Sequence, residues 1–170
     1  MYKNIIKTII KEANEEFPRT SDEKIEKYKE IRSSYKKVKE QASSIIKELR
    51  SKISDIYHYK IPTMRHMTKS IEVNGDRENL SLIKKNAHNL NLFVQEIHKL
   101  VEELNTIIPN NNHVSKVYTK LTGVLAASRK IFNKCESSST DFTIEELDKA
   151  EESARSADEE LYNITGGSLY

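Results

Sequence analysis

Apolar side chains recur every three or four residues between residues 25 and 71, and this spacing predicts one long helix with a single apolar face. Pro62 interrupts the pattern, because a proline inside a helix lacks the donor N–H and crowds the carbonyl four residues earlier, here that of His58. We expect a long first helix, a kink, and a short turn that carries Arg65. The stripe consists of Ile25, Tyr28, Tyr35, Val38, Ala42, Ile45, Leu49, Ile53, Ile56, Met64 and Ile71.

Three further stripes predict three more helices, over about residues 77–107, 113–134 and 143–165. The second helix carries Leu80, Ile83, Ala87, Leu90, Val94, Ile97, Val101 and Leu104. The third carries Val114, Val117, Leu121, Val124, Ser128 and Ile131. The fourth carries Leu147, Ala150, Ala154, Ala157 and Leu161.

Turn and capping signals separate these helices. The predicted boundaries are capping boxes at Thr20 and Thr143, a turn at Asn74-Gly75-Asp76, a stop at Pro109 with the Asn110-Asn-Asn112 turn, and a stop at Gly166-Gly167. Because short connections favour antiparallel neighbours, the sequence predicts an all-α fold: an antiparallel four-helix bundle with a kinked long first helix and a short extra N-terminal helix. Residues 1–170 form one domain, with the short helix and linker at 1–19 and the bundle at 20–170. A continuous coiled coil is the competing architecture, which the intervening loops disfavour.

Composition agrees with amphipathic helices that have solvated outer faces, since 32% of the 170 residues are charged and the mean hydropathy is -0.68. No stretch approaches the length of a membrane span, and the first residues lack the apolar region of a signal peptide. We therefore expect either a cytoplasmic protein, if Met1 is the native start, or a mature fragment of an exported one.

The net charge of +2 is unevenly distributed. Residues 1–72 hold 17 basic and 11 acidic side chains, whereas residues 141–170 hold 2 basic and 9 acidic ones. This separation is typical of helices that attract one another or of a surface that steers a protein partner. A nucleic-acid module usually has a stronger basic excess and a reader motif, so nucleic acid is not an expected partner.

Candidate chemistry is sparse. None of the five histidines lies in a spacing that presents metal ligands one helical turn apart, and no nucleophile, base and orienting group form a recognisable set. The lone Cys135 reads as a small buried side chain, with a reactive or intermolecular role as the alternative. We expect a non-enzyme without metal or cofactor.

Several segments resemble the C-terminal helical module of the fibronectin-binding, complement-inhibiting surface lipoproteins of Borrelia spirochaetes. They are Tyr35-Lys-Lys-Val-Lys39 through Ala42-Ser-Ser-Ile-Ile46 to Tyr57, Asp76-Arg-Glu-Asn-Leu80, Asn89-Leu-Asn-Leu-Phe-Val94, Asn110-Asn-Asn-His-Val-Ser-Lys116 and Gly166-Gly-Ser-Leu-Tyr170. The resemblance covers about 130 residues, from Tyr35 to the end.

The resemblance implies that the chain binds the r protease of the first complement component and blocks the classical pathway by occupying its surface. It also implies a location on the bacterial outer membrane, through a lipid anchor upstream of this chain. A basic residue late in the first helix and a lysine early in the last are implied contacts; by position they are Arg65 and Lys149. His66 and Lys69, which follow Arg65, complete the expected contact surface. Fibronectin binding is not expected of this chain, because it lacks the upstream region implied for that activity.

Plainer interpretations of these residues remain open. Arg65 can be a solvated arginine whose stem packs on Met64 or Tyr59, and Lys149 can pair with Glu145 or Glu152 on its own helix. The alternative function is a cytoplasmic structural or adaptor protein that binds partner helices through exposed stripes. A basic nucleic-acid binder, suggested by Lys36-Lys37-x-Lys39, is a third possibility.

Overall fold

The computed structural model describes residues 21–74, 78–136 and 144–165, which form helices and one turn, without a strand. The elements are α2 (Ser21–Asp55), the π-helical segment η1 (Ile56–Lys60), α3 (Ile61–Asn74), α4 (Glu78–Ile107), α5 (Asn112–Glu136) and α6 (Ile144–Thr165). The all-helical prediction is confirmed for this part of the chain. Several expected features lie outside the described residues: the helix at 1–19, the capping residues Thr20 and Thr143, the turn at Gly75, and Gly166-Gly167.

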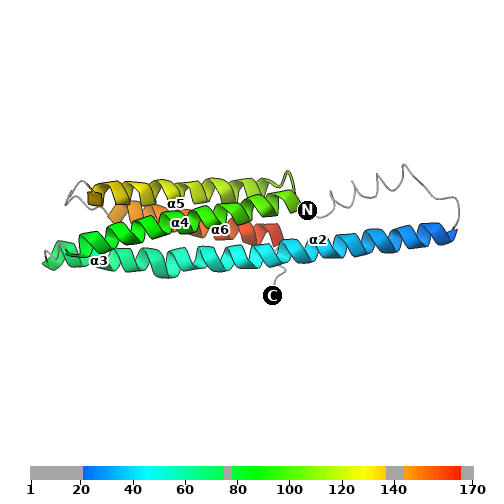
Figure 1. The fold of residues 1–170 in the computed structure, drawn as a ribbon, viewed down its shortest axis with the longest axis horizontal. Coiled ribbons are helices and arrows are strands. Elements are labelled where there is room, and N and C mark those ends of the chain that lie inside the picture. The colour runs from blue at the N-terminus through cyan, green and yellow to red at the C-terminus, as the bar shows by residue number, and fades with distance from the viewer. Residues whose placement is uncertain (1–20, 75–77, 137–143, 166–170) are drawn as a thin grey trace.

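Helices α2, η1 and α3 form one continuous helical arm, and Figure 1 shows α3 continuing α2 along the long axis of the molecule. The N–H of Ile61 donates to the carbonyl of Ile56, five residues earlier. This π-type bonding adds a residue to the turn before Pro62. The carbonyl that faces the proline ring therefore belongs to a different residue than it would in an α-helix. The expected short turn carrying Arg65 is wrong, because Arg65 lies within α3. The predicted interruption takes the form of η1 instead.

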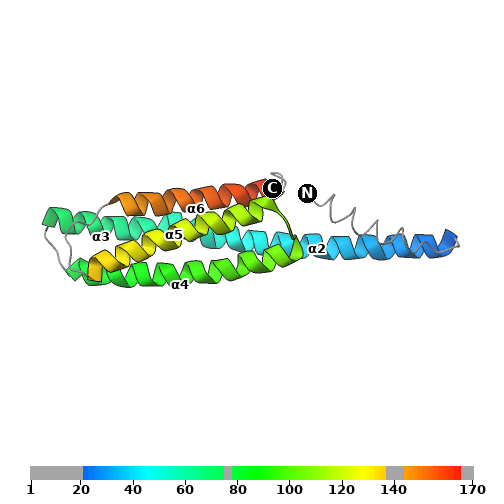
Figure 2. The ribbon, with the colours of Figure 1, turned by 90° about the horizontal axis from the view of Figure 1, so that it is seen from above.

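Each helix of the bundle packs against two neighbours. Helix α5 contacts α4 and α6, and the arm contacts the same two helices from the other side. The arm and α5 therefore lie at opposite corners of a helical bundle, an arrangement that can be followed in Figures 1 and 2.

The apolar stripes of α4, α5 and α6 supply most of the core, and nearly every predicted position in them is buried. Leu80, at the start of α4, is partly exposed. On the arm, the core begins at Ala42 and includes Leu49, Ile53 and Ile56, all with exposed fractions of 0%. Burial of such side chains provides the main stabilisation of a helical bundle, about 1.5–3 kcal/mol for each large one.

The turn between α4 and α5 follows the sequence prediction closely. Asn110 adopts a positive φ of 59°, a conformation that asparagine tolerates better than most residues. The side-chain oxygen of Asn111 accepts a hydrogen bond from the backbone N–H of His113 at 2.9 Å, and so caps the N-terminus of α5.

The outer half of α2, from Ser21 to Gln41, extends past the end of the bundle in both views (Figures 1 and 2). None of its described side chains is buried, and Ile25 and Tyr28 have exposed fractions of 53% and 58%. The predicted stripe is therefore a core element only from Ala42 onward. None of the helices in the described part of the chain combines the length and apolar character of a membrane span.

Candidate functional site

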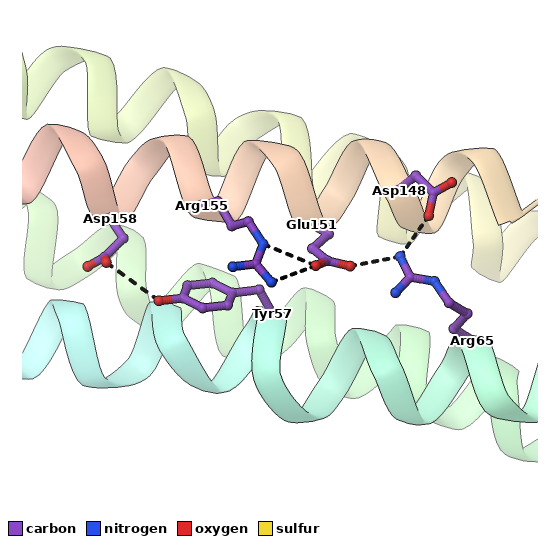
Figure 3. Close-up of polar contacts among 6 residues, drawn as sticks. All are labelled: Tyr57, Arg65, Asp148, Glu151, Arg155 and Asp158. Carbon is purple, nitrogen blue, oxygen red and sulfur yellow. Dashed lines mark hydrogen bonds and ion pairs between the residues drawn. The ribbon is translucent and has the colours of Figure 1, made fainter.

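Arg65 connects the arm to α6 through two ion pairs. Its Nη2 donates to Asp148 Oδ1 and to Glu151 Oε2, both at 2.7 Å (Figure 3). The Arg65 side chain is 26% exposed, and that of Glu151 is 19% exposed. Both bonds use the same nitrogen, so the remaining N–H groups of the guanidinium are not engaged by these two carboxylates.

Further polar contacts continue along the same interface. Arg155 Nη2 donates to Glu151 Oε1 at 2.8 Å, and its guanidinium lies 4.6 Å from the centre of the Tyr57 ring. The Tyr57 hydroxyl donates a hydrogen bond to Asp158 at 3.5 Å. Asp158 also accepts a hydrogen bond from Arg50 Nε at 2.8 Å. We call this set the charge ladder; Figure 3 draws all of it except Arg50. Its members are Arg50, Tyr57, Arg65, Asp148, Glu151, Arg155 and Asp158.

The spacing of these residues explains why they meet. On α6 the ladder positions 148, 151, 155 and 158 are separated by three and four residues, so they form a polar row beside the buried row of Ala150, Ala154 and Ala157. On the arm, positions 50, 57 and 65 lie seven and eight residues apart. The longer step contains η1, whose additional residue keeps Arg65 on the side of the arm that faces α6.

The ladder also shifts the pKa of two of its members, Arg65 and Glu151. The hydrogen bond to Glu151 is the largest cause of a raised pKa for Arg65, with burial opposing it and Asp148 adding to it. For Glu151, burial opposes ionisation, but hydrogen bonds from Arg155 and Arg65, together with their charges, outweigh it and hold the pKa below its ordinary value. The ion pair between Arg65 and Glu151 is therefore formed at neutral pH.

Two surface hollows lie along the ladder and carry opposite charge. An open groove of about 460 Å³ is lined by Arg65, Asp148, Glu151, Glu152, Arg155, Ser156 and Glu159, four carboxylates against two arginines. A larger hollow of about 1040 Å³ at the other end is lined partly by Arg50, Tyr57 and Asp158 and partly by Lys36, Lys39, Glu40 and Lys47, so four basic side chains outnumber two acidic ones. This face of the protein is thus acidic beside α3 and basic beside α2.

The four residues expected to contact a partner all lie on α3 and α6, which pack together. Arg65 binds Asp148, which lies 83 positions away from it in the sequence and directly precedes Lys149. Lys149 is exposed and pairs with Glu145 of its own helix at 2.6 Å. This agrees with the alternative interpretation of Lys149 as a residue that pairs within its own helix. His66 and Lys69 are exposed on α3.

Of the charge ladder, only Arg65 was predicted as a site residue from the sequence, and the acidic, aromatic and other basic members were missed. Their signal was the row 148, 151, 155 and 158, which resembles the polar surface of any amphipathic helix. Elsewhere, Cys135 is buried, and burial raises the pKa of its thiol to about 11. This supports its interpretation as a packed side chain, because the thiolate is the reactive form. Within the described ranges, no cluster of three or more His, Cys, Asp or Glu side chains is placed to hold a metal ion.

Comparison of the chain with protein-family models, with curated proteins and with solved structures finds no match.

Proposed function

We propose that this chain is a non-catalytic module that binds a protein through the joined surface of α3 and α6. The observation that carries the proposal is the contact between Arg65 and Asp148. It places two residues implied as partner contacts, Arg65 and Lys149, on neighbouring helices although they are distant in sequence. A single partner surface can then reach both of them.

The geometry of Arg65 suits an anchor. Its guanidinium is held by two carboxylates through one nitrogen, while N–H donors on the other nitrogens remain for a partner. Holding the group in place before binding lowers the conformational entropy lost on association. Arginines positioned in this way are common among the residues that dominate interface energies.

The specific partner that we propose is the r protease of the first complement component, with inhibition of the classical pathway by surface occupation. The resemblance to the Borrelia surface lipoproteins supports this choice and a location on the bacterial outer surface. We also propose that consecutive helices of the bundle run antiparallel, which is supported by the short turn at 108–111 between the contacting helices α4 and α5.

Binding of the full chain to purified complement proteases, with the chain immobilised, tests the proposal. Arg65→Ala and Lys149→Ala should each weaken binding at least about fivefold, or about 1 kcal/mol, the size expected for an interface anchor. The matched controls are Arg129→Ala and Lys120→Ala, which change exposed residues on α5, the helix at the corner opposite the arm. Both controls should bind as the parent chain does.

Two results would overturn the proposal. Absence of binding at micromolar concentration, together with unimpaired haemolysis through the classical pathway, removes the complement protease as partner. Binding that neither Arg65→Ala nor Lys149→Ala weakens removes the α3–α6 surface. Far-ultraviolet circular dichroism of each variant separates lost contact from lost folding.

A further inference from the structure

Two hollows of opposite charge lie next to each other along the charge ladder. The larger one, which we call the basic hollow, extends along α2 as far as Tyr57 and Asp158, and its four basic and two acidic side chains give a charge of +2. The smaller one, the acidic groove, lies between α3 and α6, and its two basic and four acidic side chains give −2. The contact between Tyr57 and Arg155 lies at the boundary of the two (Figure 3). The two surfaces therefore carry equal and opposite charge.

Most charges on these surfaces are neutralised within the chain. Each arginine that lines them is paired with a carboxylate of the charge ladder, and Lys36 is paired with Glu40. Among the described residues, four exposed charged side chains make no hydrogen bond or ion pair. They are Lys39 and Lys47 in the basic hollow, and Glu152 and Glu159 in the acidic groove.

The unpaired charges of the two surfaces have similar spacing. Lys39 and Lys47 are eight residues apart, which is about 12 Å along α2 at the helical rise of 1.5 Å per residue. Glu152 and Glu159 are seven residues apart, or about 10.5 Å along α6. The flexible four-carbon stem of a lysine can bridge this small difference. The rounded outer side of α6, which bears both glutamates, also has a shape that suits a hollow.

The side-by-side arrangement of the two surfaces suits a second copy of this chain. A two-fold axis through the contact between Tyr57 and Arg155, perpendicular to this face, places the acidic groove of each copy over the basic hollow of the other. Two-fold contacts of this kind are closed and are the commonest among homo-oligomers. An unrelated acidic segment or a nucleic acid would match the basic hollow and leave the acidic groove unmatched. Only a partner with the same pair of surfaces satisfies both.

We propose that two copies of the chain form a two-fold dimer in which Lys39 and Lys47 of each copy bind Glu152 and Glu159 of the other. Exposed ion pairs each contribute little and are screened by salt. The dimer therefore forms at high chain concentration and dissociates as the salt concentration rises. It requires no other protein. Because Arg65 lines the acidic groove, the dimer covers this residue, and a partner that binds α3 and α6 competes with it.

Sedimentation equilibrium of the full chain at low salt tests the proposal through charge reversal. In Lys39→Glu/Lys47→Glu and in Glu152→Lys/Glu159→Lys, like charges face each other across the dimer, so each variant alone should raise the dimer dissociation constant at least about tenfold. An equal mixture of the two variants should associate again. In the mixed dimer, one contact joins the two reversed surfaces and the other joins the two unchanged ones.

Matched controls reverse exposed charges on the other helices. Lys120→Glu/Arg129→Glu changes α5, and Glu96→Lys/Glu103→Lys changes α4 at the same seven-residue spacing as the glutamates of α6. In the described part of the chain, α5 does not contact the arm and α4 does not contact α6. Each control has the same net charge as one of the reversed variants and should dimerise as the parent chain does. Far-ultraviolet circular dichroism checks that every variant is folded.

Several results would overturn the proposal. A parent chain that is monomeric at about 0.5 mM and low salt forms no such dimer, and the basic hollow then belongs to a different partner. A dimer that neither reversal weakens, or that the controls weaken equally, has its interface elsewhere. A mixture of the reversed variants that stays monomeric contradicts the two-fold exchange, whereas its association supports it. Because the chain is measured alone, none of these results depends on whether it binds a complement protease.

Discussion

The outer and inner halves of α2 have the same sequence pattern and different surroundings. Ile25 and Tyr28 in the outer half are more than half exposed, whereas Leu49 and Ile53 in the inner half are completely buried. Only the inner half runs beside other helices of the bundle, with α4 and α6 as its neighbours. An apolar period therefore predicts a helix and the face it will bury, but another element must reach that face before it becomes core.

Helix lengths explain where the division falls. The arm combines helical segments of 35, 5 and 14 residues, while α4, the longest of its partners, has 30. At 1.5 Å per residue the partner helices end about 30 Å or more short of the arm. The excess length appears as the outer half of α2, because the inner half, η1 and α3 all face α4 and α6.

The largest expected effect comes from matched truncations in the two halves. Ile53→Ala should lower the free energy of unfolding by about 2–4 kcal/mol, because it opens a cavity at a fully buried position. Ile25→Ala should lower it by less than about 0.5 kcal/mol in the same urea titration, because this side chain is not part of the bundle core. Equal losses from the two variants would show that the bundle core extends along the whole of α2.

A smaller effect should follow from matched changes of charge. Glu151→Gln removes the carboxylate that binds both Arg65 and Arg155 in a partly buried interface, and we expect a loss of about 1–2 kcal/mol. Glu40→Gln breaks the ion pair with Lys36 in the outer half of α2. The Glu40 and Lys36 side chains are 64% and 78% exposed, so this change should have no measurable effect on stability. Thermal unfolding of the two variants provides the comparison. A neutral Glu151→Gln would show that the ladder contributes nothing to stability.

The smallest expected effect is a pH dependence of the stability difference between the parent chain and Glu151→Gln. The pKa of Glu151 in the folded protein lies below its ordinary value of 4.5. The ionised Glu151 carboxylate therefore contributes stability above that ordinary value, and this contribution is lost as the pH falls through the folded pKa. Urea unfolding at about pH 6 and about pH 3 should show a smaller gap in the free energy of unfolding between the parent chain and Glu151→Gln at the lower pH. A constant gap would contradict the ladder's electrostatic role.

The helices of the described residues and the faces that they bury could be predicted from the sequence, because the apolar stripes are long and the turn residues are distinctive. The turn at Asn110 follows from its turn residues, and the buried rows of α4, α5 and α6 follow from the spacing of apolar positions. The π-helical segment left a weaker signal, which the kink interpretation overlooked. Buried positions on the arm advance from Ile56 to Ile61, a step of five residues, and then resume steps of three and four at Met64 and Thr68.

The charge ladder could not be predicted in the same way. Asp148 and Glu151 repeat with helical spacing, but so do the solvated carboxylates on the rest of α6. Which of them meets Arg65 depends on the neighbour of α6 and on the residue added by η1, and both are properties of the tertiary arrangement. The sequence suggested Arg65 as a residue of interest without indicating the carboxylates that hold it.

Hydrogen exchange along α2 of the parent chain tests the division of this helix most directly. We expect that amides between Ile45 and Asp55 exchange only through global unfolding, and that amides between Ile25 and Lys37 exchange at least about tenfold faster through local opening. Protection should change near Ala42, where the first buried side chain of α2 lies. Uniform protection from Ile25 to Asp55 would contradict this division of α2, because it would make the whole helix one cooperative unit with the bundle.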